Sequence, residues 1–266
     1  MLLTPEDRYV QAVVSKYKIK DDRQVGLNFL YPLIPEHIRI KNIFTEPIKD
    51  WAGQYLNDIF VSGSRAKGTA IKGGTDVDLF ISLKADTPAT LKEIFNLLHT
   101  FCANDQGLKT RKQNVSIGVE YQGKKIDLVP AKQQKGYINY HSLYKNKSDS
   151  WTQTNITEHI NLVKNSGRID DIVALKIWRQ INNLDFPSIY LELTVLEVLT
   201  NKVRLQPAKN FETIMEYLRD EFVEKRVVDP CNINNIISDD LYKYEKEAIA
   251  KKAKETLKMT WERAFY

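Results

Sequence analysis

Residues 60–83, FVSGSRAKGTAIKGGTDVDLFISL, decide the fold because they join a glycine–serine turn to a strand that begins with two aspartates. Residues two positions apart on a β-strand face the same side, so Asp76 and Asp78 project together. The opposite face is apolar and consists of Val77, Leu79 and Ile81. The stretch therefore predicts a strand that buries one face and carries a pair of carboxylates on the other.

The paired carboxylates need a chemical reason to lie side by side. Two such charges about 4 Å apart repel each other by roughly 4 kcal/mol at an effective dielectric constant near 20. They require a counter-charge, a shared proton or open water. Ligands that are all oxygen suit a hard divalent cation such as Mg²⁺ or Mn²⁺. Taken alone, the motif leaves open two exposed acids on an edge strand.

The glycine–serine turn lies upstream, in SGSRAKGT. Gly63 and Gly68 let the backbone approach a ligand closely, and Ser64 offers a hydroxyl and a backbone N–H. A helix that begins here would present its N-terminus to a phosphate. A P-loop is excluded because Thr69 follows Gly68 where that motif requires lysine. An ordinary turn stays open as the alternative.

A third acid, Asp127, lies in KKIDLVPA between Ile126 and Leu128. An acid inside an apolar strand is costly unless it is solvated, paired or bound to a metal. This short strand could lie beside the strand of residues 76–83. A lone acid on an exposed face is the alternative.

Composition sets the remaining bounds. The chain has 266 residues, 42 % of them hydrophobic, and can bury a substantial core, while its net charge of +5 tolerates a polyanionic partner without requiring one. Cys102 and Cys231 have no partners at metal-ligand spacing, which argues against a zinc site. The N-terminal stretch MLLTPEDRYVQAVV has no long apolar run, so we expect a cytoplasmic protein without a membrane span.

The texture of the sequence changes along the chain. Residues 5–19 and 45–58 favour helices separated by a connector at residues 30–38, and residues 60–130 alternate strands with one helix. The basic group Lys109, Arg111 and Lys112 is expected in a solvated loop. Strand signals end near residue 150, after which the chain predicts helices over residues 170–182, 188–201, 210–225 and 241–265. The lysines of the last helix favour a solvated face, with Tyr242, Ile249, Ala253 and Leu257 turned inward.

The ordered set of GS, GT, TDVDLF and a later strand aspartate resembles the polymerase-β-like nucleotidyltransferase superfamily. The resemblance implies that Asp76 and Asp78 hold two Mg²⁺ ions, with Mn²⁺ as an alternative. It also implies that Asp127 shares one metal and helps to activate the acceptor hydroxyl, while Gly63 and Ser64 cradle the β- and γ-phosphates. Two cations about 3.5 to 4 Å apart can neutralise a leaving pyrophosphate, so the reaction implied is nucleotidyl transfer.

The helical half extends the resemblance to cGAS/DncV-like bacterial enzymes, the CD-NTase and oligoadenylate synthetase-like branch. In ALKIWRQINNLDFPSIYLELTVLEVL, residues 174–199, the likeness implies that Lys176 and Ser188 bind the triphosphate and that Tyr190 or its neighbour lies near the base. For Lys176, a solvated helix face is the alternative. The segment VVDPCNINNI is similar to a segment near the end of these enzymes, and a structural role in turns and caps is favoured for Asp229, Asn232, Asn234 and Asn235.

The fold implied is α+β, with a small mixed-sheet nucleotidyltransferase (palm) core followed by a helical domain and an active site in the cleft between them. We expect an N-terminal helical segment at residues 1–58, the catalytic core at 59–150 and the helical domain at 151–266. The function implied is synthesis of a cyclic or short linear oligonucleotide second messenger from NTPs in anti-phage, CBASS-type signalling. RNA or DNA is an optional acceptor or activator, and the sequence leaves the oligomeric state open.

Two other functions stay open at this point. A terminal RNA nucleotidyltransferase, such as a CCA-adding or tRNA-modifying enzyme, would use the basic C-terminal helix KYEKEAIAKKAKETLK to contact a phosphate backbone. A catalytically silent nucleotide-binding regulator would keep the fold without the reaction. All three acids and the glycine–serine turn are present, which disfavours the silent regulator.

Overall fold

The computed structural model describes residues 3–19, 34–74 and 76–265, and the chain divides into two compact units. The sheet unit comprises residues 20–67 and 75–160, and the helical unit comprises residues 1–19, 68–74 and 161–266. Each unit therefore draws on separate segments of the chain. The expected boundaries at residues 58 and 150 stay a prediction.

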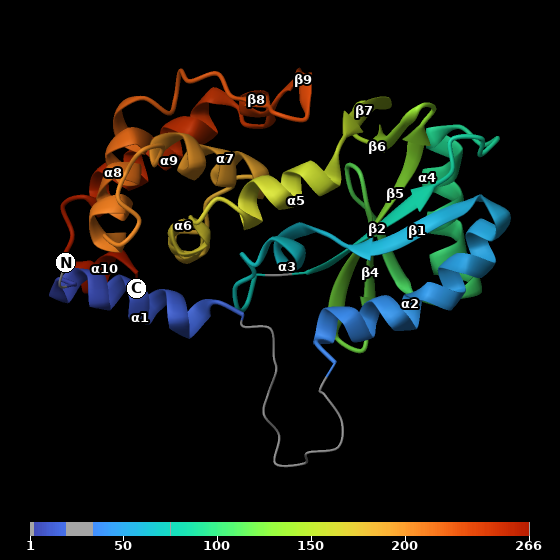
Figure 1. The fold of residues 1–266 in the computed structure, drawn as a ribbon, viewed down its shortest axis with the longest axis horizontal. Helices are drawn as coiled ribbons and strands as arrows, with labels where there is room; N and C mark the ends of the chain where they lie inside the picture. The colour runs from blue at the N-terminus through green and yellow to red at the C-terminus, as the bar shows by residue number, and fades with distance from the viewer. Residues whose placement is uncertain (1–2, 20–33, 75, 266) are drawn as a thin grey trace, which may run out of the picture. The chain divides into compact units, whose positions relative to one another are not determined.

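The sheet unit is built on a seven-stranded mixed sheet in which β1, β2, β5, β4 and β3 lie in that order (Figure 1). Strands β2 and β5 are parallel, β6 pairs with the C-terminal part of β5, and β7 pairs with β6. The strands are β1 Leu56–Val61, β2 Val77–Leu83, β3 Lys109–Lys112, β4 Ile117–Tyr121, β5 Lys124–Gln134, β6 Tyr137–Lys145 and β7 Ser150–Thr154. This arrangement confirms the small mixed sheet predicted from the sequence.

Helices α2 Glu36–Ala52 and α4 Leu91–Thr100 cover one face of the sheet (Figure 1). A capping box between Thr90 and Glu93 starts α4, and a π-helical turn, Phe101–Asp105, extends it. The apolar face of β2 packs under these helices, and Leu79 is fully buried there. Burying one such leucine contributes about 2 kcal/mol, which fixes the face that β2 turns inward.

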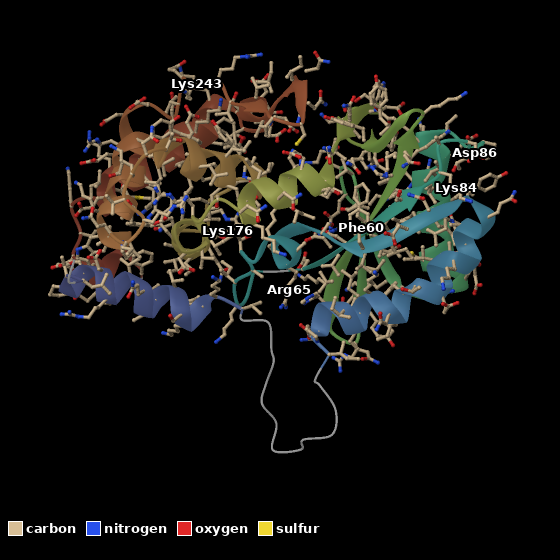
Figure 2. The ribbon with its side chains drawn as sticks, in the orientation of Figure 1. Phe60, Arg65, Lys84, Asp86, Lys176 and Lys243 are labelled. Atoms are coloured by element: carbon tan, nitrogen blue, oxygen red, sulfur yellow. The ribbon has the colours of Figure 1, made fainter. Side chains whose placement is uncertain are left out.

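The other face of β2 is partly covered as well. Phe80 pairs with Phe60 of β1, with ring centroids 5.0 Å apart, and Phe60 is labelled in Figure 2. Ala131 and Leu143 complete this small cluster. Asp78 lies on the same face as Phe80, toward the strand's N-terminal end, where the chain arrives from helix α3 Gly63–Lys67.

The helical unit has a continuous apolar core to which α1, α6, α7, α8 and α9 contribute. Its largest fully buried side chains include Trp178, Tyr190 and Phe222. The helices are α1 Pro5–Tyr17, α5 Ile156–Lys164 (which begins in the sheet unit), α6 Ile169–Ile181, α7 Ser188–Val198, α8 Pro207–Asp220, α9 Lys243–Thr256 and α10 Trp261–Ala264. A short hairpin, β8 Val228–Asp229 and β9 Asn232–Ile236, lies between α8 and α9.

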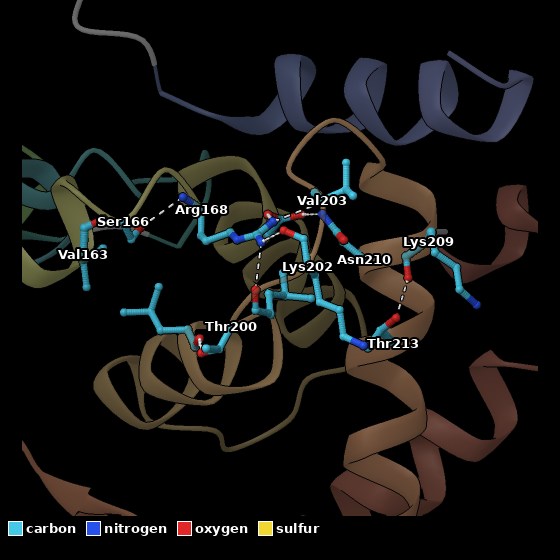
Figure 3. Close-up of polar contacts among 12 residues, drawn as sticks. Val163, Ser166, Arg168, Thr200, Lys202, Val203, Lys209, Asn210 and Thr213 are labelled. Carbon is cyan, nitrogen blue, oxygen red and sulfur yellow. Dashed lines mark hydrogen bonds and ion pairs between the residues drawn. The ribbon is translucent and has the colours of Figure 1, made fainter. Parts of the chain in front are cut away.

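Arg168 connects the start of α6 to the loop that follows α7 (Figure 3). Its guanidinium donates a 2.8 Å hydrogen bond to the Leu199 carbonyl and a second hydrogen bond to the carbonyl of Lys202. The same group forms an ion pair with Asp171, at 3.4 Å. Leu199 is the C-cap of α7, and its carbonyl also accepts a 3.1 Å hydrogen bond from the Lys202 N–H. Arg168 therefore connects the end of α7 and the loop after it to α6.

The structure corrects several expectations drawn from the sequence. Helix α2 begins at Glu36, inside the predicted connector, whose residues 30–33 lie outside the described residues, and it ends at Ala52, before the predicted end at residue 58. The basic group Lys109–Lys112 forms β3 rather than a loop. Strands continue past residue 150 as β7, β8 and β9, and α5 was not predicted. Tyr242 is 72 % exposed instead of inward, whereas Ile249 and Ala253 are buried as expected.

No helix among residues 3–19, 34–74 and 76–265 is both long and apolar enough to cross a membrane.

A buried histidine makes the stability of the sheet unit depend on pH. His141 is 4 % exposed, and its Nε2 lies 2.8 Å from Ser82 Oγ. Burial lowers the pKa of His141, so the folded protein holds the ring neutral, while the unfolded chain protonates near pH 6.5. The stability that depends on the neutral ring is therefore present above about pH 6.5 and is lost as the pH falls below it, by at most about 1.4 kcal/mol per pH unit.

Urea unfolding between about pH 8 and pH 5 tests this expectation on the wild type and on His141→Asn. The variant should be less stable at the upper end, because the bond to Ser82 changes, and its stability should fall less steeply toward low pH. Parallel pH profiles for the two proteins would show that His141 does not contribute the pH dependence.

Candidate active site

The register of β2 and β5 brings three acids together on one face of the sheet. In this parallel pair, Asp78 lies directly beside Asp127. Asp76 precedes Asp78 by two positions, and both Asp76 and Asp127 line one pocket. The structure therefore brings together the acids Asp76, Asp78 and Asp127, which the sequence predicted to act as a set.

The opposite faces of these strands hold the acids in place. Leu79 and Leu128 are register partners, as are Val77 and Ile126, and all four are at most 3 % exposed. Because side chains alternate along a strand, slipping the pair by one residue would turn the acids into this apolar layer. The register is thus fixed by hydrophobic burial rather than by the acids themselves.

Asp127 lies in a setting that disfavours its negative charge. Burial raises the pKa of Asp127 above its ordinary value, and the negative charge of Asp76 raises it further. A hydrogen bond from Gln113 Nε2 to Asp127 Oδ1, 2.7 Å long, and the positive charge of Arg111 act in the opposite direction. A cation bound between the acids would relieve both of the unfavourable contributions.

Gly63 lies against Asp78 and could not be another residue without rearrangement. Its φ is +58°, which favours glycine, and a Cβ built on it would overlap the Asp78 carboxylate. The preceding residue, Ser62, donates its backbone N–H to the Asp78 carbonyl at 2.8 Å. The glycine–serine turn and the acids are therefore parts of one local structure, with Ser64 in the first turn of α3.

The donor set fits a hard divalent cation. The three acids offer carboxylate oxygens, the ligand type that Mg²⁺ and Mn²⁺ prefer. They lie on neighbouring strands, one of them disfavoured as an anion by its surroundings. The mutual repulsion of these charges is the physical reason to expect a bound cation.

A pocket of about 210 Å³ opens beside Asp76 and Asp127. Its lining also includes three cationic residues, Lys109, Arg111 and Lys125, and a third acid, Glu120. Lys109 pairs with Glu120 across the β3–β4 hairpin at 3.6 Å, and all three cationic side chains are exposed. The pocket therefore brings carboxylates and cationic side chains together, which suits a ligand that carries both a hydroxyl and phosphate groups.

Gln113 and Gly118 are the site residues that sequence reasoning missed. Gly118 lies opposite Asp127 in the register of β4 and β5, and a Cβ there would come within 2.7 Å of Gln113 Nε2. The glycine thus leaves room for the bond between Gln113 and Asp127. The only sequence signal is a glycine inside a strand, which often marks a close approach of another group.

The helical unit places Lys176 in its interior. Lys176 is 2 % exposed, and its Nζ lies 2.7 Å from Glu192 Oε1 and donates a 2.9 Å hydrogen bond to Thr69 Oγ1. The structure thus excludes the solvated face left open for this lysine. Its predicted contact with a triphosphate stays a prediction.

Ser188 and Tyr190 differ sharply in exposure. Ser188 is exposed at the start of α7, and its hydroxyl accepts a 3.1 Å hydrogen bond from Arg179 Nη1. Tyr190 is 0 % exposed and packs between Phe186 and Phe222 in the helical core. Its ring is therefore covered by other side chains, and the predicted position near a base stays a prediction that this burial does not favour.

The VVDPCNINNI segment forms the β8–β9 hairpin. Asp229 Oδ1 accepts a hydrogen bond from the Cys231 N–H at 2.8 Å, and Asp229 Oδ2 accepts one from Asn235 Nδ2 at 3.2 Å. Asn232 Oδ1 accepts a bond from the Asn234 N–H at 3.2 Å. Asp229 and Asn232 thus take the role in turns predicted for them, whereas Asn234 and Asn235 lie in β9.

Comparison with known proteins agrees with this geometry. Residues 37–166 match the family model described as the Second Messenger Oligonucleotide or Dinucleotide Synthetase (SMODS) domain. No curated protein sequence matches the chain. The matched region includes Asp76, Asp78, Asp127 and the glycine–serine turn.

Three solved proteins share the fold over nearly the whole chain. CdnC of E. coli MS115-1 has a TM-score of 0.74 at 19 % identity. The match covers 98 % of this chain and 92 % of CdnC in the structure with ATP. In the complex with HORMA-deltaN it covers 98 % of this chain and 91 % of CdnC. The CD-NTase CdnG of Bradyrhizobium diazoefficiens, in complex with GTP, has a TM-score of 0.72 at 12 % identity, covering 99 % and 96 %. The Cid1 poly(U) polymerase bound to MgATP has a TM-score of 0.68 at 11 % identity, covering 97 % and 98 %. These matches confirm the α+β nucleotidyltransferase fold.

Replacing Gly63 by alanine should remove cation binding. The new Cβ would overlap the Asp78 carboxylate. The alanine would also have to keep the left-handed backbone conformation of Gly63, which costs a residue with a side chain about 1–2 kcal/mol. Gly107→Ala is the matched control, because Gly107 has a φ of +60° with open space around it. Both variants should unfold at lower temperature, but only Gly63→Ala should lose Mn²⁺ binding in a titration followed by electron paramagnetic resonance. Equal Mn²⁺ affinities in the two variants would contradict the role assigned to Gly63.

Replacing Gln113 by leucine should make cation binding more sensitive to pH. Without the hydrogen bond that favours the carboxylate, the already raised pKa of Asp127 rises further, so the acid ionises only at higher pH. Mn²⁺ affinity of Gln113→Leu should therefore be close to the wild-type value near pH 8 and fall below it near pH 6, by about threefold to tenfold. Gln134→Leu, which removes an amide hydrogen-bonded to Ser142 at the β5–β6 pair, is the control. A constant ratio of affinities across the pH range would refute this assignment.

Proposed function

We propose that this chain joins nucleoside triphosphates into a short oligonucleotide with release of pyrophosphate, because residues 37–166 match the model of the Second Messenger Oligonucleotide or Dinucleotide Synthetase domain. The single observation that carries the proposal is the set of three carboxylates, Asp78 on β2, Asp76 directly before that strand and Asp127 on β5, with Gly63 against Asp78. The product is a cyclic or short linear oligonucleotide.

The reaction forms one phosphodiester bond and breaks one phosphoanhydride bond. The acceptor hydroxyl gives up its proton, its oxygen attacks the α-phosphorus of a second nucleotide, and the bond to the bridging oxygen breaks as pyrophosphate leaves. Asp127 is suited to help activate the hydroxyl, because its carboxylate lies beside Asp78 in the strand register and lines the pocket that the acceptor would enter. Gln113 orients the same carboxylate through its 2.7 Å hydrogen bond.

Asp76, Asp78 and Asp127 would hold the divalent cations, Mg²⁺ with Mn²⁺ as the alternative, in a two-ion arrangement. When bound, these ions neutralise the charge that develops on the phosphates. The Cid1 structure contains MgATP, which supports Mg²⁺ as the physiological ion. The contribution of the chain is to fix three carboxylates on rigid strands, so that no reorganisation is needed when substrate enters.

The donor nucleotide would place its β- and γ-phosphates at Gly63 and Ser64, where the backbone lies closest to Asp78. Ser188 is exposed and fits the predicted contact with the triphosphate, whereas Lys176 already has a carboxylate partner and Tyr190 is enclosed. The acceptor would enter the pocket beside Asp127, where Lys109, Arg111 and Lys125 offer charge to its phosphates.

Nucleoside triphosphates are the proposed substrates, since CdnC was solved with ATP and CdnG with GTP. The CdnC complex with HORMA-deltaN shows that one protein of this fold has a protein partner. The cytoplasmic location and the anti-phage role stay predictions. The experiment below tests whether the enzyme needs RNA or DNA as an acceptor or activator.

Incubation with Mg²⁺ or Mn²⁺ and all four α-labelled NTPs tests the reaction. The wild type should form a labelled product without added RNA, and the Asp76→Asn and Asp78→Asn variants should lose at least about a hundredfold in rate, because each removes a carboxylate from the cation site. Asp86→Asn is the matched control, because Asp86 is exposed beyond the C-terminal end of β2 (Figure 2).

The products separate the alternatives. Phosphatase removes terminal phosphates only, so a cyclic product keeps all of its label and its chromatographic mobility, whereas a linear product loses the label of its 5′-terminal nucleotide and changes mobility. Product that appears only when tRNA or another RNA is added would replace the proposal with terminal RNA transfer, and NTP binding without pyrophosphate release would indicate a silent regulator.

A further inference from the structure

Ser116 lies in the turn of residues 113–116, which connects β3 to β4. The Gln113 N–H closes this turn by donating a 2.9 Å hydrogen bond to the Ser116 carbonyl. The whole turn belongs to the sheet unit, as does Asp127. Ser116 is 4 % exposed, so its hydroxyl is buried and needs a partner inside the protein.

The partner of this hydroxyl is the side chain of Gln113. Ser116 Oγ donates a 3.2 Å hydrogen bond to Gln113 Oε1, and Gln113 Nε2 donates the 2.7 Å hydrogen bond to Asp127 Oδ1. The two bonds form a series, here called the relay, that runs from the turn to the carboxylate. Gly118 leaves room for the relay, because a Cβ at that position would come within 2.7 Å of Gln113 Nε2.

The chemistry of the three side chains allows one arrangement of the relay when Asp127 is ionised. A carboxylate only accepts hydrogen bonds, so it must face the NH₂ end of the Gln113 amide. The amide oxygen then faces the turn and requires a donor, which the Ser116 hydroxyl supplies. Without this hydroxyl the amide oxygen would lose its partner, and an amide that turned to find another donor would move Nε2 away from Asp127.

The turn that carries the relay is held by a neighbouring turn of the sheet unit. The Asn146 N–H donates a 2.7 Å hydrogen bond to the Asn114 carbonyl, and the Lys147 N–H donates one of 3.2 Å to Asn114 Oδ1. Both donors lie in residues 146–149, which connect β6 to β7. These bonds limit how far the backbone beside Ser116 can move.

The turn does not need the Ser116 hydroxyl for its own closure. Its backbone is closed by the bond between Gln113 and Ser116, and the bonds to Asn114 hold it from outside. An alanine at position 116 would occupy the same backbone without burying a polar group. What alanine lacks is a donor for Gln113 Oε1. The hydroxyl therefore contributes to the placement of the amide and, through the amide, to that of Asp127.

We propose that Ser116 is a positioning residue that acts through Gln113 to hold the Asp127 carboxylate in one orientation toward the acceptor hydroxyl. The inference rests on the proposed function for the role of Asp127. A misplacement of about 1 Å can cost about a hundredfold in rate, so a residue that fixes the orientation of a reacting group affects the chemical step without contacting the substrate.

Three variants and one control test the proposal. Ser116→Ala removes the hydroxyl, Gln113→Leu removes the amide, and the double variant removes both. Ser142→Ala is the matched control, because Ser142 Oγ accepts a 3.0 Å hydrogen bond from the Gln134 side chain at the β5–β6 pair. It therefore loses a serine–glutamine bond of the same kind away from Asp127.

Three measurements are made on each protein near pH 8, after urea unfolding has shown that it is folded. Nuclear magnetic resonance follows hydrogen exchange of the Gln113 side-chain amide, whose signal is identified by its absence in Gln113→Leu. Electron paramagnetic resonance gives the Mn²⁺ affinity. Turnover of NTPs gives kcat and KM.

Ser116→Ala should exchange the Gln113 side-chain amide about tenfold faster than wild type, since the amide loses one of its two bonds. Its kcat should fall by about threefold to tenfold with little change in KM. Mn²⁺ affinity should stay close to wild type, because the three carboxylates themselves are unchanged. The double variant should match Gln113→Leu in kcat, because a residue that acts only through Gln113 adds nothing once Gln113 is gone. Ser142→Ala should match wild type.

Unchanged exchange or unchanged kcat in Ser116→Ala overturns the proposal. So do additive losses of kcat in the double variant, which would show that Ser116 acts by another route, and a loss of Mn²⁺ affinity in Ser116→Ala, which would show a general disturbance of the site. A folded wild type that makes no product defeats the proposed function instead, and the exchange rates then decide whether Ser116 fixes the amide.

Discussion

The parallel pairing of β2 with β5 is the interaction on which the rest of the structure depends. It places Asp78 beside Asp127, and the hydrophobic layer under α2 and α4 holds it in register. The acids gain nothing from lying together in the absence of a cation, so the apolar residues on the other face must supply the stability that keeps them there. The hydrophobic core on the opposite face of the sheet therefore stabilises the position of the acids.

Two glycines and one amide refine what the register provides. Gly63 and Gly118 leave room where any side chain would crowd a carboxylate or its hydrogen-bond partner, and Gln113 turns one oxygen of Asp127. Arg111 and two lysines supply the opposite charge in the same pocket. Carboxylates fixed by the strand register and exposed cationic side chains therefore line one pocket, which suits a substrate that carries phosphates.

The sequence predicted the acidic face, because alternation along a strand is a local property that Asp76, Val77 and Asp78 display directly. It did not predict Gln113, since the partner of Asp127 depends on how β3, β4 and β5 align. The lysine at position 176 looked like part of a solvated helix face because its partners, Glu192 on the next helix and Thr69 near the first strands, are distant in sequence. The enclosed position of Tyr190 likewise comes from Phe222, which no local pattern connects to it.

The discontinuous helical unit has a consequence for how the protein is made. Its core draws on α1 at the start of the chain, on Ile71 and on helices that end near residue 265. During synthesis, all strands of the seven-stranded sheet are available once β7 has left the ribosome. Helix α1 and residues 68–74, in contrast, can pack into the helical core only after α6 to α9 have been made. The first residues of the helical unit therefore cannot be buried until helices that follow the whole sheet unit in the sequence have been made.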